Sequence, residues 1–225
     1  MRIVLAGLLL AAASSASAAP APPPAPPALP KIFLSPMGEP FRASTEGDDP
    51  VTDWFRGADR DGDGAISLAE MQADAARFFA TLDRNHNGEI DPEEIGRYEH
   101  DVAPEIQLGG QLTPFRWGAR RERRDRDDER KAREDGLQGA GRLSWLNIPE
   151  PVAAADADLN RGVSRDEFAR AAADRLGRLD SNQDGKLSRA ELPRLPEQWT
   201  DEERKAAKKR LKDKKAADGI PIPID

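Results

Sequence analysis

Residues 59–70 read DRDGDGAISLAE, and this stretch decides the fold. Acidic side chains occupy positions 1, 3, 5 and 12 of its twelve residues. Alternate side chains of a tight loop can point at one centre, where a hard cation takes six to eight oxygens at about 2.3–2.6 Å. Gly64 at position 6 supplies the sharp bend, because glycine tolerates a positive φ. The stretch therefore predicts a loop folded around a hard cation.

The same pattern occurs three more times along the chain. Residues 83–94 read DRNHNGEIDPEE, residues 156–167 read DADLNRGVSRDE and residues 180–191 read DSNQDGKLSRAE. Each loop of the second pair begins 97 residues after its counterpart, at 156 after 59 and at 180 after 83. A constant offset of this kind indicates a duplicated two-loop unit rather than four unrelated matches.

Each loop offers the oxygen ligands that calcium prefers. They come from the side chains at positions 1, 3 and 5, the backbone carbonyl at 7, position 9 (often through water) and two oxygens of the glutamate at 12. We expect up to four Ca²⁺ ions. The predicted ligands are Asp59, Asp61, Asp63, Ala65, Ser67 and Glu70; Asp83, Asn85, Asn87, Glu89, Asp91 and Glu94; Asp156, Asp158, Asn160, Gly162, Ser164 and Glu167; and Asp180, Asn182, Asp184, Lys186, Ser188 and Glu191.

The third loop departs from the pattern at its bend. Arg161 occupies position 6, and the glycine of this loop, Gly162, comes one residue later. A residue other than glycine in the left-handed region costs about 1–2 kcal/mol. We therefore expect the third site to be the weakest of the four, or to be rearranged.

The short spacing between paired loops determines the architecture. Only the twelve residues 71–82 separate the first loop from the second, which leaves room for one helix shared by both loops. A helix over residues 68–82 spans about 22 Å at 1.5 Å per residue, so its two loops lie at opposite ends. We predict an all-α fold of two loop–helix–loop units with their joining helices packed together. Short β-bridges then form between loops of different units.

The relative direction of the joining helices decides which loops meet. Antiparallel packing would place Ile66 against Leu187 and Ile90 against Val163, whereas parallel packing would pair the first loop with the third. Both helices carry an apolar stripe at spacings of 3, 4 and 7 residues, as expected for a buried face. The stripe comprises Leu68, Met71, Ala75, Phe78, Phe79 and Leu82 in the first helix, and Phe168, Ala172, Leu176 and Leu179 in the second.

The amino terminus has the features of a secretory signal. Arg2 is followed by an apolar run over residues 3–13 that is too short to span a bilayer, and Ala16-Ser17-Ala18 fits a cleavage site. We expect cleavage near Ala18 and a periplasmic or secreted mature protein, with a membrane anchor as the alternative.

Composition divides the chain into six segments. They are a signal peptide (1–18), a Pro-rich linker and extended arm (19–48), the first two-loop unit (49–103), a linker with a mixed-charge helix or disorder (104–148), the second two-loop unit (149–199), and a basic helix with an extended tail (200–225). The basic helix is interpreted as solvated, with contact to an anionic membrane surface as the alternative.

Charge and residue usage exclude several classes of function. The chain of 225 residues is acidic, with a formal net charge of −7, and has no cysteine, so disulfides and thiol chemistry are absent. Arginines in residues 120–135 are nearly balanced by acids without interleaved aromatic residues, which argues against nucleic-acid binding. No phosphate loop or nucleophile–base constellation is present, so we do not expect an enzyme.

The four loops and their helices resemble the EF-hand superfamily. Together with the signal segment, the twelve-residue spacing resembles bacterial secreted EF-hand proteins, of which lanmodulin is one. The resemblance implies calcium binding and raises lanthanide binding. The proline typical of lanmodulin loops at position 2 is replaced here by Arg60, Arg84, Ala157 and Ser181. Every loop ends in glutamate rather than the aspartate usual in dockerins.

Three functions follow from these features. The first is an extracytoplasmic calcium-binding protein acting as a Ca²⁺ buffer or structural calcium module. The second is a metal-triggered regulatory protein that binds an unidentified protein partner, with Phe78, Phe79 and Phe168 lining the groove. The third is a lanthanide-binding periplasmic protein.

Overall fold

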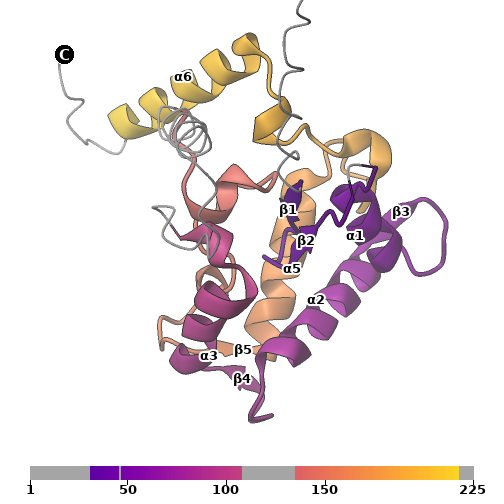
Figure 1. Cartoon of the computed structure of the whole chain (residues 1–225), viewed down its shortest axis with the longest axis vertical. Helices are drawn as coiled ribbons and strands as arrows, with labels where there is room; N and C mark the ends of the chain where they lie inside the picture. Colours follow the sequence, from indigo (N-terminus) through magenta and orange to yellow (C-terminus); the bar gives the residue numbers. More distant parts are fainter. Residues whose placement is uncertain (1–30, 46, 108–134, 218–225) are drawn as a thin grey trace, which may run out of the picture.

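Two long helices form the centre of the molecule. The computed structural model describes residues 31–45, 47–107 and 135–217, and in this part the fold is mostly helical, as predicted. Helix α2 (Leu68–Leu82) and helix α5 (Arg165–Leu179) pack side by side along their length (Figure 1). Their apolar stripes are buried against each other, except for Leu68 at the first position of α2, which is 42% exposed.

The β-bridges show that the two joining helices are antiparallel. Strand β3 (Ala65–Ser67) pairs with β6 (Lys186–Ser188), and β4 (Glu89–Ile90) pairs with β5 (Val163–Ser164), both antiparallel. The two bridges lie at opposite ends of α2 (Figure 1). The first loop therefore meets the fourth and the second meets the third, as the antiparallel alternative predicts.

The residues at the centre of each bridge are fully buried. Ile66 lies opposite Leu187 and Ile90 lies opposite Val163, and the relative exposure of all four side chains is 0%. Each pair belongs to the one hydrophobic core that includes residues from both units. The duplicated units are thus joined through a common core rather than packed as separate bodies.

The two units differ in the elements that flank their loops. The remaining helices and turns are α1 (Pro50–Ala58), α3 (Pro92–Arg97), a π-helical turn (Tyr98–Val102), α6 (Asp201–Ala217), and 3-10 turns at Pro104–Ile106, Gly139–Arg142, Ala153–Ala155, Arg189–Glu191 and Pro196–Gln198. In the second unit, 3-10 turns stand where the first unit has α1 and α3. Pro151 and Pro193 lie beside these turns, and proline restricts helix continuation.

The arm before the first unit forms a hairpin within the core. Strand β1 (Ile32–Leu34) pairs antiparallel with β2 (Pro40–Arg42), and Phe33, Leu34 and Met37 are buried. The sequence predicted an extended arm, but it did not predict this pairing. The hairpin covers the aromatic side of α1, where the rings of Phe33 and Trp54 lie 5.8 Å apart.

The prediction that residues 104–148 form a linker is wrong for the carboxyl end of this segment. Residues 135–148 pack into the core: Ala140 and Leu146 are buried, and the ring of Trp145 lies 4.6 Å from Phe33. The backbone N–H of Leu34 also donates to the carbonyl of Leu143 at 2.9 Å. The apolar residues in this short stretch find partners that are distant in sequence, which local composition cannot reveal.

Several sequence predictions lie outside the described residues. These are the signal peptide (1–18), the Pro-rich linker up to residue 30, most of the mixed-charge run within 108–134, and the tail 218–225. No helix in the described ranges is long and apolar enough to cross a membrane. Helix α6 forms as predicted, and Asp135 contacts its Arg204 at 2.5 Å.

A buried arginine on α5 forms hydrogen bonds to the hairpin and to the start of the second unit. Arg175 is 2% exposed and donates to the carbonyls of Pro36 at 3.0 Å and Pro151 at 2.6 Å. Nearby, Oε1 of Glu150 is buried without a hydrogen-bond partner in the described structure. Burial, opposed by the hydrogen bond from the Ala153 N–H and aided by the charge of Glu99, raises the pKa of Glu150 to about 7.

Replacing Glu150 with glutamine should stabilise the protein at alkaline pH. The folded-state pKa lies above the unfolded value of 4.5, so the native state favours the protonated form. That contribution is fully present below pH 4.5 and is lost as the pH rises through about 7. We expect E150Q to melt a few degrees above wild type at pH 8 and at nearly the same temperature at pH 4.

Thermal melts followed by circular dichroism in chelator would measure this difference. E202Q, which removes an exposed carboxylate on α6, is the control for a general change in charge. An equal gain for E150Q at both pH values would show that ionisation of Glu150 is not the cause.

Candidate metal centres

The four loops share one backbone conformation, and the third is not rearranged. At position 6, φ is 87° for Gly64, 87° for Gly88, 78° for Arg161 and 82° for Gly185. Arg161 thus takes the left-handed conformation in spite of its side chain. The alternative of a rearranged third loop is wrong, and the strain expected for a non-glycine residue at this position is present.

The first residue of every loop holds the bend in place. Its carboxylate Oδ2 accepts the backbone N–H of position 6 in all four loops, at 2.8–3.2 Å. The pairs are Asp59 with Gly64, Asp83 with Gly88, Asp156 with Arg161, and Asp180 with Gly185. The position-1 ligand is therefore oriented toward the inside of each loop by the backbone.

The glutamate at position 12 closes each loop. In all four, its carboxylate accepts backbone N–H groups from positions 2, 3 and 9 at 2.8–3.3 Å. These bonds, with the neighbouring serine N–H and hydroxyl as the largest contributions, lower the pKa of Glu70, Glu167 and Glu191 to about 2. Because these carboxylates are ionised at neutral pH, they are ready to bind a cation.

The predicted ligands come together most clearly in two of the loops. Carboxylate oxygens of Asp59, Asp61 and Asp63 lie within 4.8 Å of one another in the first loop, as do those of Asp156, Asp158 and Glu167 in the third. In the second and fourth loops the side chains at position 3 are amides, Asn85 and Asn182, which also offer oxygen. The donor sets are all oxygen and fit a hard cation such as Ca²⁺.

The predicted carbonyl ligands are positioned by the bridges. Ala65, Glu89 and Lys186 lie in strands β3, β4 and β6, and Gly162 directly precedes β5. Pairing of these strands holds each position 7 next to the loop of the other unit. The bridges therefore connect the two predicted sites at each end of the α2–α5 pair.

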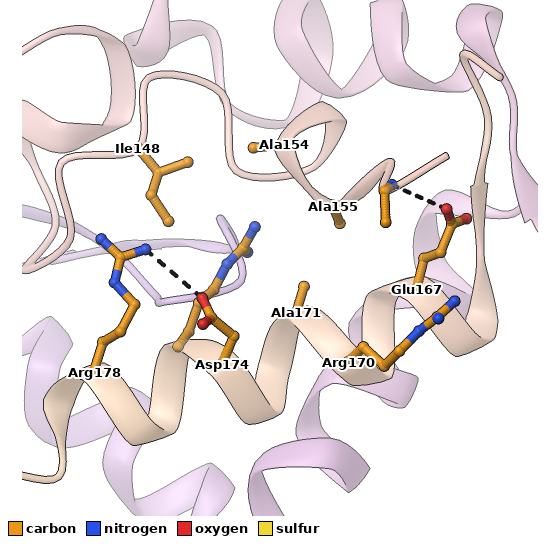
Figure 2. A pocket seen from close by; sticks show the side chains of 10 residues that line it. Ile148, Ala154, Ala155, Glu167, Arg170, Ala171, Asp174 and Arg178 are labelled. Atoms are coloured by element: carbon orange, nitrogen blue, oxygen red, sulfur yellow. Dashed lines mark hydrogen bonds and ion pairs between the residues drawn. The ribbon is translucent and has the colours of Figure 1, made fainter. Parts of the chain in front are cut away.

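A hollow of about 350 Å³ lies beside the third loop, between α5 and the turn at Ala153–Ala155 (Figure 2). Its polar lining groups have partners within the protein. Glu167 accepts the N–H of Ala157 at 3.0 Å, and Arg178 contacts Asp174 at 3.8 Å. The hollow thus adds no further ligand to the third centre.

Comparison with known families agrees with this geometry. A family model described as EF hand matches residues 51–73, 75–97 and 173–195, which contain the whole of the first, second and fourth loops. These three matches support membership in the EF-hand superfamily. Membership in this superfamily implies calcium binding. The third loop is not matched, although its backbone follows that of the other three. No curated protein and no solved structure matches the chain.

Two basic side chains that no sequence pattern indicated contact predicted ligand carboxylates. Lys186 Nζ lies 2.7 Å from Oδ2 of Asp63, and Arg165 Nη2 lies 3.1 Å from Oδ2 of Asp83. Both contacts join residues of different units. The only signal for them is the register of the bridges, which requires that the direction of the helices be known.

Replacing Arg161 with glycine should stabilise the third loop. Glycine removes the cost of the left-handed conformation, about 1–2 kcal/mol, in a loop that keeps its geometry. We expect the metal-free protein to melt a few degrees higher. Because the metal-free loop already has the left-handed bend, the calcium affinity of the folded protein should change little. Calorimetric titration with Ca²⁺ and thermal melts in chelator would measure both effects.

The control is R161Q, which removes the same positive charge but keeps the Cβ atom. If R161Q and R161G raise stability equally, the effect belongs to the charge of Arg161 and not to the strain of its backbone.

Proposed function

We propose that this protein is an extracytoplasmic calcium-binding protein with four EF-hand sites that acts as a structural calcium module or Ca²⁺ buffer. The observation that carries the proposal is the pairing of loops across the two units. Each bridge joins a loop of one unit to a loop of the other, and its central residues are fully buried. An ion in any loop therefore stabilises the contact between units, because it binds the folded state in preference to the unfolded one.

The third site is included because its loop has the hydrogen bonds and backbone angles of the other three. Asp156, Asp158 and Glu167 also form one of the two carboxylate clusters in the described structure. The strained Arg161 makes this loop the least stable of the four.

The proposed location rests on the predicted signal peptide, residues 1–18. Outside the cytoplasm, calcium sites typically have dissociation constants of about 10⁻⁴–10⁻³ M. Sites of this strength are filled at extracellular calcium concentrations, which suits a stabilising or buffering role. No catalytic activity is proposed.

The closed core shows what a sensor role would require. Phe78, Phe79 and Phe168, predicted to line a partner groove, are only 1–2% exposed. The ring of Phe168 lies 5.7 Å from Phe79, between α2 and α5. A metal-triggered regulatory protein would have to separate these helices to expose the rings. A lanthanide-binding role remains an alternative, since the oxygen ligands also suit trivalent ions.

Calcium should raise the stability of the mature protein without exposing its core. We expect the melting temperature to rise by several degrees as the Ca²⁺ concentration is raised from about 10 μM to about 10 mM in tenfold steps. The fluorescence of an apolar dye should stay low throughout. Parallel titration with La³⁺ separates the lanthanide alternative.

A rise in dye fluorescence on addition of Ca²⁺ would favour the sensor. Binding of La³⁺ many orders of magnitude tighter than Ca²⁺, with Ca²⁺ barely effective, would favour the lanthanide role. No response to either ion would refute metal binding altogether.

Loops that share a bridge should be energetically coupled, whereas loops that share a helix should not. A double-mutant cycle with E70Q and E191Q removes one ligand from each loop of the β3–β6 bridge. We expect a coupling of about 0.5–3 kcal/mol in the calcium-dependent gain in stability. The matched cycle, E70Q with E94Q, combines loops at opposite ends of α2 and should be additive within about 0.5 kcal/mol. Equal coupling in both cycles would contradict the proposed role of the bridges.

A further inference from the structure

Two positive charges from the second unit are held on ligand carboxylates of the first unit. Lys186 occupies position 7 of the fourth loop, and its Nζ donates to Oδ2 of Asp63 at 2.7 Å. Arg165 occupies position 10 of the third loop, and its Nη2 donates to Oδ2 of Asp83 at 3.1 Å. Each bridged pair of loops thus contains one basic side chain that contacts a predicted metal ligand of the opposite loop.

The contact of Lys186 follows from the β3–β6 bridge. Lys186 is the register partner of Ser67, so its side chain extends along the first loop. Asp63 there belongs to the cluster with Asp59 and Asp61, and the first loop has four acidic ligands. The ammonium group lowers the pKa of Asp63, and Asp63, Asp61 and Glu70 together raise the pKa of Lys186. The cation therefore lies within the field of the whole site.

The contact of Arg165 is fixed by packing as well as by charge. Its guanidinium group lies over the ring of Phe79, 4.9 Å from the centroid. Its acceptor, Asp83, has a side-chain exposure of 0%. Because Asp83 is the predicted position-1 ligand of the second loop, the guanidinium holds a positive charge against a carboxylate that a metal ion would bind.

The fourth loop contains a natural comparison for Arg165. Arg189 has the same position 10 and lies over Phe55, 4.5 Å from the centroid, just as Arg165 lies over Phe79. However, Arg189 Nη1 donates to the hydroxyl of Thr52 at 3.3 Å instead of to the position-1 carboxylate. The two arginines share their stacking and differ in the contact with a ligand.

We propose that Lys186 and Arg165 are built-in counter-cations that weaken metal binding at the first and second loops and discriminate against trivalent ions in favour of divalent ones. In the metal-free protein they neutralise part of the carboxylate charge. An incoming ion has to displace or share these contacts and is repelled by the same positive charges. The proposal rests on the proposed function, in which these loops bind calcium.

Coulomb's law predicts how the effect depends on the ion. Repulsion by a fixed unit charge is proportional to the charge of the ion, so it is half again as large for La³⁺ as for Ca²⁺. At separations of several ångströms in a water-exposed site, removal of one such charge should tighten Ca²⁺ binding by about 3–10-fold. The corresponding gain for La³⁺ is about 5–30-fold.

The experiment compares K186Q and R165Q with R189Q in the mature full chain, by calorimetric titration with Ca²⁺ and with La³⁺. K186Q and R165Q should tighten both ions, La³⁺ more than Ca²⁺, and R189Q should leave both within about twofold of wild type. The gains should disappear when the affected loop is disabled, for K186Q by E70Q and for R165Q by E94Q. K186R keeps the charge and should behave as wild type.

Different failures have different meanings. If K186Q and R165Q tighten binding no more than R189Q does, or tighten both ions by the same factor, the counter-cation proposal is wrong while calcium binding stands. If the wild type binds neither ion, the proposed function is wrong, and this proposal is wrong with it. Should R165Q fail to fold because it loses the stacking on Phe79, K186Q still decides the question, since Lys186 is half-exposed and outside the core.

Discussion

The structure depends on the rigidity of a helix that is shared by two loops. α2 has 15 residues and spans about 22 Å, so the loops at its ends cannot contact each other. An isolated loop exposes the backbone of its central strand, which needs a partner. That partner has to come from the other unit, and the same holds for α5. The antiparallel arrangement satisfies both ends at once, and it buries the apolar stripes of both helices in one core.

The same side chains serve the metal sites and the starts of the helices. In the first loop, Ser67 and Glu70 form the capping box of α2, and they are also positions 9 and 12. Asp91 and Glu94 have this dual role at α3. In each capping box, the glutamate carboxylate accepts a backbone N–H at the start of the helix. These hydrogen bonds hold the carboxylate near the loop and favour its ionised form. The geometry of the loops is thus maintained largely by the chain itself, before any ion binds.

Sequence patterns predicted what is local and what repeats. The loops, their ligands, the shared helices and the two alternatives for pairing all follow from spacing within a few dozen residues. The choice between the alternatives does not, because both bury the same stripes. The contact of Trp145 with Phe33 and the burial of Arg175 between two backbone carbonyls also escaped prediction. The contacts of Trp145 with Phe33 and of Arg175 with Pro36 join segments about 110 to 140 residues apart, and the contact of Arg175 with Pro151 joins residues 24 apart. No periodicity marks any of them.

The duplicated units have diverged in complementary ways. The first keeps complete flanking helices and glycine at position 6 of both loops, whereas the second has 3-10 turns and the strained Arg161. The second unit also supplies both cations that contact ligands of the first. In the other direction, the carboxylate of Glu89 in the second loop lies against Gly162 of the third loop, where a side chain would require Glu89 to move. Charged side chains thus reach across the bridges from both units. The second unit places positive charges on the first unit, and the second loop places a negative charge beside the third loop. A charged side chain at position 7 or 10 of one loop therefore contributes to the electrostatic potential at the site of the partner loop. The metal affinity of either loop then depends on the sequence of both.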